Sequence, residues 1–273
     1  MKGLDASRIR RSLMRHSAPY LDRIEVLPRI DSTNTYLKDQ PAPPPGQFRI
    51  AIAEHQTAGR GRHDRQWLSS PGGSLCLSLA YQFEHTPLGL PALTLALGVG
   101  IADALADIGV VDVALKWPND VLVGDAKLGG ILTETLFRGP GGATVITGVG
   151  LNIDLRASAE AIESSAWADS ATSLQQVMNE PPLREELSEI VIVSLMTTFK
   201  TFEKQGYKAF AERFDAYDWL RNKTISVASP EGSVRGIAAG VSDSGALLVD
   251  TKSGLREVHT GSIEQVGEPD NGQ

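Results

Sequence analysis

The chain has few of the residues that hold small disulfide-rich or zinc-binding proteins together. It contains a single cysteine among 273 residues, which excludes an internal disulfide framework and favours a reducing compartment. That residue, Cys76, stands between two leucines, a setting typical of a buried strand rather than of a nucleophile. The five histidines show no spacing typical of metal ligands, so we expect no structural or catalytic zinc site.

Several motifs of known chemistry are also missing. There is no G-x-x-x-x-G-K-[ST] phosphate loop and no G-x-S-x-G nucleophile elbow, and the pair Gly148 and Gly150 lacks the third glycine of a dinucleotide-binding fingerprint. No signal peptide is recognisable, and the apolar run at residues 88–102 is broken by glycine and proline, so we expect it to be too short to span a bilayer. A net charge of −7 argues against a nucleic-acid partner. We therefore expect a cytoplasmic protein with neither a membrane nor a nucleic-acid partner.

The most distinctive stretch that is present is residues 58–63, with the sequence AGRGRH; residues 58–67 are called the Arg/Gly loop below. Strand-like segments flank this loop at residues 48–53 and 74–81. Glycine can adopt a positive φ and lets backbone amides approach a ligand, while arginine grips carboxylate or phosphate through two parallel hydrogen bonds. The pattern favours a mobile cationic flap that brings two anions together, but on its own it fits an exposed basic surface loop equally well.

Hydrophobic periodicity predicts an α+β fold. Helices are expected at residues 4–14, 35–38, 93–108, 183–199 and 200–217, and strands at 24–30, 48–53, 74–81, 113–117, 121–123, 128–134 and 143–153. Residues 155–182 are expected to be loop and short helix. From residue 222 onward, short strands at 224–227, 234–241, 246–249 and 255–259 alternate with Gly, Ser and Asp turns, which predicts a small all-β barrel.

Three further clusters carry polar residues at the ends of predicted elements. Residues 116–120 (KWPND) are followed by 127–130 (KLGG), and a hairpin between them would point Asp120 and Lys127 into one cleft. Such a pair is often only a surface ion pair, but the adjacent glycines, which let a ligand approach, favour a functional site. Residues 31–34 (DSTN) alone indicate a helix cap, and 148–152 (GVGLN) alone indicate a closely packed strand.

Taken together and in this order, the clusters resemble those of the biotin protein ligases. The matching segments are residues 31–34, 54–67 (EHQTAGRGRHDRQW), 116–120, 127–132 (KLGGIL) and 148–152, and the resemblance covers about residues 26–265. It implies an α+β fold in which a mixed β-sheet catalytic domain is flanked by helices and followed by a small C-terminal SH3-like β-barrel. The implied domains are a short N-terminal helical segment (1–23), the biotin- and ATP-binding catalytic domain (24–221), the barrel (222–268) and a flexible tail (269–273).

The resemblance also implies a reaction in two steps. Biotin and ATP would form biotinyl-5′-AMP and pyrophosphate, and the biotinyl group would then pass to a lysine of a biotin carboxyl carrier protein, such as a subunit of acetyl-CoA carboxylase. Magnesium would be held mainly by the phosphates of ATP, with no dedicated protein ligands. The family also suggests a side-by-side homodimer through a sheet edge.

Site residues follow from the resemblance, position by position. Positive side chains would offset the repulsion between a carboxylate and a triphosphate, and a carboxylate would help to deprotonate the acceptor amine. The implied catalytic residues are Arg62, Lys127 and Asp120. The implied biotin contacts are Ser32, Thr33, Asn34, Gln56, Gly59, Arg60, Gly61, Arg62, Trp67, Lys127 and Gly129. The implied nucleotide contacts are Arg62, Arg65, Trp67, Asn119, Lys127 and Asn152.

Two other functions remain open from the sequence. Lipoate ligases and octanoyltransferases share the catalytic fold and the lysine-modifying chemistry, although they typically lack this Arg/Gly loop and the terminal barrel. A regulator that senses biotinyl-5′-AMP is the second alternative. Only residues 1–23 precede the strand expected at Ile24, so we expect a ligase without the winged-helix DNA-binding domain and repressor activity of many bacterial relatives.

Overall fold

A seven-stranded mixed β-sheet organises the protein, for which the computed structural model describes residues 4–137, 142–158 and 170–267. The strand order is β1-β2-β5-β9-β8-β7-β6, and only the β1–β2 pair is parallel. The strand bounds are β1 Leu21–Leu27, β2 Phe48–Ala53, β5 Ser74–Gln82, β6 Val113–Lys116, β7 Asp120–Val123, β8 Ala126–Leu136 and β9 Thr144–Asn152.

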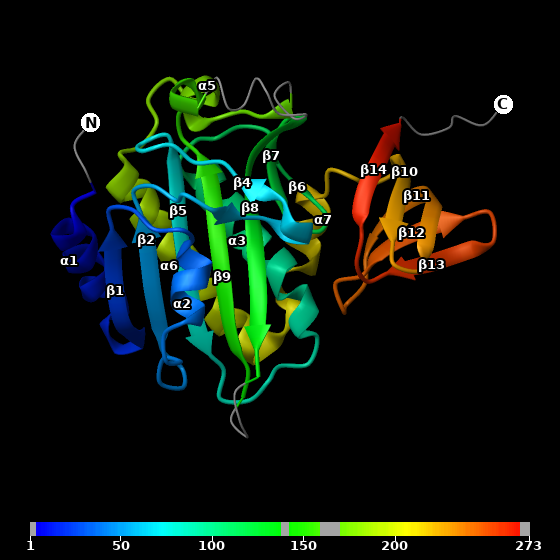
Figure 1. Cartoon of the computed structure of the whole chain (residues 1–273). Coiled ribbons are helices and arrows are strands. Elements are labelled where there is room, and N and C mark those ends of the chain that lie inside the picture. The colour runs from blue at the N-terminus through cyan, green and yellow to red at the C-terminus, as the bar shows by residue number, and fades with distance from the viewer. Residues whose placement is uncertain (1–3, 138–141, 159–169, 268–273) are drawn as a thin grey trace.

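Helices cover one face of this sheet and leave most of the other face to short elements. Helices α3 (Leu93–Asp107) and α6 (Arg184–Gln205) lie behind the sheet in Figure 1, with α1 (Ala6–Ser17) and α7 (Ala211–Tyr217) to either side. In front of the sheet lie the short helix α2 (Thr33–Lys38) and the hairpin of β3 (Gly59–Arg60) and β4 (Gln66–Trp67). The open face between these short elements is therefore where a ligand can reach the strands.

Strand β5 shows why the two faces differ. Large side chains alternate along it with small ones, and a strand sends successive side chains to opposite faces. The large set, Leu75, Leu77, Leu79 and Tyr81, belongs to the main core with the helices. On the other face, Ala80 packs with Leu37 of α2, and Ser78 contacts Thr33 and Asn34. The small residues leave room above the sheet.

An aromatic cluster fixes α6 against the helix-covered face. The rings of Phe48, Tyr81, Phe83 and Phe199 have centroids between 4.4 and 6.0 Å apart, and all four residues are fully buried. Aromatic pairs at these separations contribute about 0.5–1.5 kcal/mol each beyond the area that they bury. The sheet is therefore a firm support for whatever binds on its open face.

The predicted mixed sheet flanked by helices is confirmed, with corrections to individual elements. We expected helices at 183–199 and 200–217, but α6 continues to Gln205 because the helix ends only at Gly206, whose φ is +66°. Strand β14 (Ser262–Gly267) and the β3–β4 pair were not predicted. Residues 269–273, expected to be a tail, lie outside the described residues.

The apolar run that we expected to be too short for a bilayer extends further than predicted. Residues Leu90–Asp107 form a helical stretch of 18 residues that is long and apolar enough, by length and composition alone, to cross a membrane. However, 67% of the stretch is buried inside the fold, where α3 packs against both the sheet and α6. A core helix passes the same test, so the burial accounts for its apolar composition.

A second sheet follows at the carboxyl end. Its five antiparallel strands are β10 (Thr224–Ser229), β11 (Gly232–Val241), β12 (Leu247–Thr251), β13 (Gly254–Val258) and β14, in the order β13-β12-β11-β10-β14. No ladder joins β13 to β14 among the described residues, so the expected closed barrel is not confirmed. The sheet contacts the rest of the chain through Trp117, whose Nε1 donates to Gly245 O at 3.1 Å.

Asp218 lies at the junction between the two sheets. It forms an isolated bridge with Leu115 of β6, and its Oδ1 accepts a hydrogen bond of 3.0 Å from Leu220 N. Its Oδ2 has no partner among the described residues. Burial raises the pKa of Asp218 to about 6, although the Leu220 amide and the charge of Arg221 oppose the shift. A negative charge at neutral pH is therefore unfavourable at this position.

Asp218→Asn keeps an acceptor for Leu220 N and removes the buried charge. Because the folded-state pKa lies above the ordinary 3.8, the aspartate stabilises the fold below that value and loses this contribution as the pH rises through about 6. We expect the difference in Tm between variant and wild type to become more positive from about pH 4 to about pH 7, by a few degrees at roughly 2–4 °C for each kcal/mol. Thermal unfolding followed by circular dichroism measures this, and a pH-independent difference would contradict it.

Candidate active site

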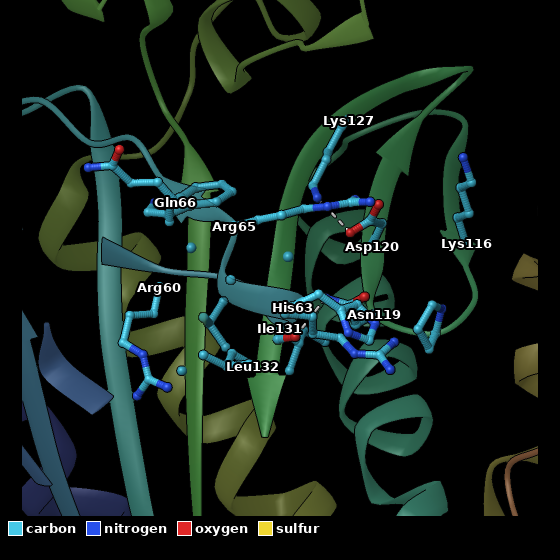
Figure 2. Close-up of a pocket in the computed structure, with 18 of the residues that line it drawn as sticks. Arg60, His63, Arg65, Gln66, Lys116, Asn119, Asp120, Lys127, Ile131 and Leu132 are labelled. Atoms are coloured by element: carbon cyan, nitrogen blue, oxygen red, sulfur yellow. Dashed lines mark hydrogen bonds and ion pairs between the residues drawn. The ribbon is translucent and has the colours of Figure 1, made fainter. Parts of the chain in front are cut away.

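A cavity of about 300 Å³ opens on the free face of the sheet (Figure 2). Its walls come from α2, the Arg/Gly loop, strands β7, β8 and β9, and the carboxyl-terminal sheet. This volume lies at the lower end of the range usual for small-molecule sites. The elements that meet here are far apart in the sequence, so only the folded chain forms the cavity.

Glycines of β8 and β9 make part of the cavity floor. Gly130 pairs with Gly150 across the two strands. A Cβ at Gly150 would overlap the ring of Trp67, and a Cβ at Gly148 would overlap the amide of Asn34. The missing side chains are therefore what lets Trp67 and Asn34 rest directly on the sheet.

Four buried polar residues, Thr33, Asn34, Gln56 and Ser78, form a hydrogen-bonded chain along the floor; we call them the polar floor. Thr33 N donates to Gln56 Oε1 at 2.8 Å, and Ser78 Oγ donates to Asn34 Oδ1 at 2.6 Å. The hydroxyls of Thr33 and Ser78 are 2.6 Å apart. Thr33 Oγ1 also donates to Gln56 Oε1 at 3.0 Å, so these three hydroxyl contacts share two hydrogens.

Glu134 of β8 terminates this chain. Asn34 Nδ2 donates to Glu134 Oε2 at 3.0 Å, Lys38 Nζ lies 2.9 Å from Glu134 Oε1, and Arg60 Nη1 lies 3.3 Å from the same oxygen. Burial alone would raise the pKa of Glu134, but the hydrogen bonds from Lys38 and Asn34 and the charge of Arg60 outweigh burial and lower it. Glu134 is therefore an ionised carboxylate that serves three donors.

A bulge in β8 directs Lys127 into the cavity. Val121 pairs with Gly129 and Leu122 pairs with Lys127, so Leu128 has no partner in β7 and is buried in the core. Successive side chains of a strand point to opposite faces. The extra residue, Leu128, therefore leaves Lys127 on the cavity face of the sheet, like Leu122 opposite it. Lys127 Nζ then lies 2.6 Å from Asp120 Oδ1, as the predicted hairpin suggested.

Positive charge dominates the cavity lining. Among the described residues, the lining contains five Lys and Arg side chains (Arg60, Arg62, Arg65, Lys116 and Lys127) and two carboxylates, Asp120 and Asp125. Burial lowers the pKa of Arg62. The charge of Asp120 opposes this shift, and the charge of Arg65 adds to it. Burial likewise lowers the pKa of Lys116, with Lys127 and Arg65 adding to it and Asp120 opposing it. Clustered, partly desolvated cations of this kind are stabilised by an anionic ligand.

The Arg/Gly loop folds as a hairpin rather than as an irregular flap. Gly59 and Arg60 pair with Trp67 and Gln66, and the turn contains a short 3₁₀ helix, η2 (Arg62–Asp64). His63 has a φ of +53°, in the left-handed region that non-glycine residues seldom adopt. Arg60 lies on the opposite side of the view from Asp120 and Lys127 in Figure 2, while Arg65 extends toward Asp120.

The carboxyl-terminal sheet supplies one wall of the cavity. Gly261, Ser262 and Ile263 line it, and Arg62 Nη2 donates to Thr260 Oγ1 at 3.5 Å. Trp219, at the junction of the sheets, lines the same side. The ammonium groups of Lys116 and Lys223 lie 5.0 and 3.4 Å from its ring centroid, and its Nε1 donates to Asp125 Oδ1 at 2.8 Å.

Most of the site residues implied by the sequence meet in this cavity. Those that line it are Ser32, Thr33, Asn34, Gln56, Arg60, Gly61, Arg62, Arg65, Trp67, Asn119, Asp120 and Lys127. Three do not line it: Gly59, Gly129 and Asn152. A Cβ at Gly129 would point toward Gly150 O and Leu151, and the amide of Asn152 donates to Thr172 O at 3.0 Å. Their ligand contacts stay predictions.

Sequence reasoning missed several residues of the site. Ser78 and Glu134 belong to no motif and look like ordinary strand residues in the sequence. Their partners, in α2 and the Arg/Gly loop, are distant in the chain. Trp219 and residues 261–263 come from the carboxyl-terminal part of the chain and belong to no motif that would indicate a binding site. The described residues contain no group of three or more His, Cys, Asp or Glu side chains arranged to hold a metal ion.

Comparison with known families and sequences gives one consistent result. The Biotin/lipoate A/B protein ligase family model matches residues 26–152, and the Biotin protein ligase C terminal domain model matches residues 222–264. The chain is 33% identical over 230 residues to the bifunctional ligase/repressor BirA of Escherichia coli, covering 83% of this chain and 69% of that protein. It is 31% identical over 219 residues to the biotin–[acetyl-CoA-carboxylase] ligase of Mycobacterium tuberculosis, covering 78% and 77% of the two chains.

Solved structures agree with the sequence comparisons. The biotin protein ligase of Aquifex aeolicus in complex with biotin and ATP matches with a TM-score of 0.74 at 28% identity, over 89% of this chain and 98% of that one. The ligase of Leishmania major in complex with biotinyl-5-AMP has a TM-score of 0.57 at 21% identity, a likeness of fold alone. On these identities and coverages, this chain belongs to the biotin protein ligase family and is a ligase.

Proposed function

We propose that this ligase attaches biotin to a lysine of a biotin carboxyl carrier protein, through biotinyl-5′-AMP. The observation that supports it most is a single cavity with two chemically different ends. Asn34 of the polar floor lies over Gly148, opposite Leu132, whereas the Lys127–Asp120 pair lies beside Gly130, opposite Gly150 and the Trp67 ring. Lys127 and Leu132 both line the cavity and are five positions apart on β8, roughly 15 Å along a strand. An elongated ligand can therefore place an uncharged ring system at one end and its carboxylate at the other.

In the first step, the carboxylate of biotin attacks the α-phosphorus of ATP and pyrophosphate leaves. Two anions must approach each other, so cations aimed at the developing charge lower the barrier. Lys127, Arg62 and Arg65 line the end of the cavity where these groups would meet. Among the described residues of the lining, two carboxylates offset this positive charge, which supports binding of a triphosphate here.

In the second step, the amine of the acceptor lysine attacks the acyl carbon and AMP leaves. The amine must lose a proton, because its ordinary pKa is about 10.4. Asp120 fits the role of orienting this amine and accepting its proton. Lys127 Nζ lies 2.6 Å from Asp120 Oδ1, so the phosphates would compete with Asp120 for Lys127 in the first step.

The uncharged end suits the head of biotin. A ureido ring needs hydrogen-bond partners on both its N–H groups and its carbonyl, and Thr33, Asn34 and Gln56 offer hydroxyl and amide groups. Trp67 adds an apolar wall. Gly59 and Gly129 remain proposed biotin contacts and Asn152 a proposed nucleotide contact, although none of the three lines the cavity.

Magnesium would enter with ATP rather than occupy a site of its own. Asp120 is already paired with Lys127, and Asp125 accepts from Trp219. One or two carboxylates and the substrate phosphates are the surroundings that this ion prefers. When bound, it would neutralise phosphate charge, and the residues of the chain would orient the groups that react.

The proposal extends to organisation and partners. We propose a catalytic domain at residues 24–221 and a carboxyl-terminal domain at 222–268 with an SH3-like barrel topology, supported by the family match at 222–264. An acetyl-CoA carboxylase subunit is the expected carrier, since relatives bear the name biotin–[acetyl-CoA-carboxylase] ligase. We place the reaction in the cytoplasm. Lipoate and octanoate are the alternative acyl groups, because the family model at 26–152 spans both classes of enzyme.

Lys127→Ala should reduce biotin-dependent pyrophosphate release by about 100-fold or more, since it removes a charge aimed at the reacting groups. Pyrophosphate release with biotin, lipoate or octanoate measures both this effect and the choice of acyl group. Lys208→Ala, an exposed lysine outside the cavity, is the control and should behave like wild type. Normal release by the Lys127 variant would exclude its proposed role.

Asp120→Asn should still form the adenylate but transfer biotin to carrier about 100-fold more slowly, because the amide cannot accept a proton. The two half-reactions are measured separately, by pyrophosphate release and by single-turnover transfer from preformed adenylate. Asp125→Asn, a second carboxylate of the same cavity, should transfer at the wild-type rate. An equal loss of both half-reactions in Asp120→Asn would remove the assignment.

Arg62→Gly should release adenylate into solution and biotinylate bystander lysines, because the loop would no longer cover the mixed anhydride. Mass spectrometry of a mixture of carrier and serum albumin counts the modified lysines. Arg156→Gly, a surface arginine paired with Asp154, serves as the control. If the Arg62 variant labels carrier alone, this arginine has no retaining role.

A further inference from the structure

Glu134 is the only carboxylate that contacts both α2 and the Arg/Gly loop among the described residues. Asn34 and Lys38 reach it from α2, where they are one helical turn apart, and Arg60 reaches it from β3. Its side chain is 18% exposed, compared with 42% for Arg60. None of the family motifs singled out in the sequence includes Glu134.

The amide of Asn34 has its orientation fixed from two sides. Ser78 donates to Oδ1, and Nδ2 donates to Leu132 O and to Glu134. An ionised carboxylate can only accept hydrogen bonds, so Glu134 requires the NH₂ group of Asn34 on its side. The Oδ1 atom is thereby held above Gly148 as an acceptor at the cavity floor.

The same carboxylate also fastens the Arg/Gly loop. The β3–β4 hairpin rests on the sheet at Trp67, which lies over Gly150, and at Arg60, whose guanidinium reaches Glu134. This ion pair, which Lys38 shares, offsets part of the charge of Arg60 at a distance from Lys127 (Figure 2). Charge-assisted hydrogen bonds of this kind are about twice as strong as neutral ones.

We propose that Glu134 is a positioning residue that couples the Arg/Gly loop to the polar floor, through Arg60 on one side and Asn34 on the other. Loss of Glu134 frees the hairpin at Arg60 and removes one of the two acceptors of the Asn34 NH₂ group, the other being Leu132 O. The Asn34 amide is then held less firmly beneath the substrate. The effect on substrate binding rests on the proposed function, whereas the effect on the loop does not.

The first experiment uses the protein without ligands. Limited trypsin digestion followed by mass spectrometry gives the rate of cleavage after Arg60, Arg62 and Arg65. We expect about a fivefold or greater increase in both Glu134→Gln and Glu134→Ala, since both variants remove the charged partner that holds Arg60 to the sheet. Cleavage after Lys252, in an exposed turn of the second sheet, is the internal reference and should not change. Unchanged loop cleavage in both variants overturns the coupling.

The second experiment measures binding and turnover separately. Calorimetric titration of biotin without ATP should show a Kd about tenfold higher in Glu134→Ala, and a smaller rise in Glu134→Gln, which keeps one acceptor for Asn34. The KM for ATP and the kcat at saturating biotin should stay within about twofold. A fall in kcat with an unchanged biotin KM would indicate only a general loss of structure, and would overturn the positioning role.

A matched control removes a carboxylate from the other side of α2. Glu25 accepts a hydrogen bond of 2.8 Å from Tyr36 of α2 and does not line the cavity. Glu25→Gln should leave the loop cleavage rate and the biotin Kd unchanged, whereas a change equal to that of Glu134→Gln would overturn the specific coupling. A last outcome separates the two proposals. If the wild-type protein binds no biotin, but the Glu134 variants are still cleaved faster in the Arg/Gly loop, the proposed function fails while the loop coupling stands.

Discussion

The approach of Lys127 to Asp120 is the contact on which the charged end of the site depends, and it exists because β8 carries one residue more than its partner strand. Without the bulge at Leu128, alternation along the strand would turn Lys127 toward the core, where an unpaired ammonium is costly to bury. With it, Leu128 fills the core and the ammonium enters the cavity beside the only carboxylate of β7. A local irregularity of the backbone thus decides where the chemistry can occur.

Each end of the cavity is organised by one carboxylate. Asp120 holds Lys127 among the cations of the charged end, and Glu134 holds Arg60 and Lys38 near the polar floor. Glu134 offsets part of the charge of Arg60 and Lys38, and the other cations of the lining lie where a carboxylate and phosphates would meet. The division follows from the small residues of β5 and β9, which leave space above the sheet for α2 and the hairpin.

Prediction from sequence succeeded where the residues that contact each other also lie close together in the chain. The cluster that ends at Asp120 and the one that begins at Lys127 lie within a short hairpin, so their proximity followed from strand pairing alone. Strand β2 was predicted with its observed bounds because its apolar run is continuous. The helix boundary at residue 199 was wrong because no residue there ends a helix, whereas Gly206 does. Glu134 and Ser78 were missed because neither has a partner nearby in the sequence.

From the amino-acid sequence alone, the family follows from the resemblance of several short motifs in a set order, and the mixed sheet flanked by helices follows from periodicity. Each motif and each periodic pattern depends on residues within a few positions of one another. Which side chains meet depends on the folded chain: the bulge that turns Lys127, the glycines under Trp67 and Asn34, and the wall supplied by the second sheet. These contacts join segments far apart in the chain, and their geometry follows from strand register and packing, which short motifs do not encode.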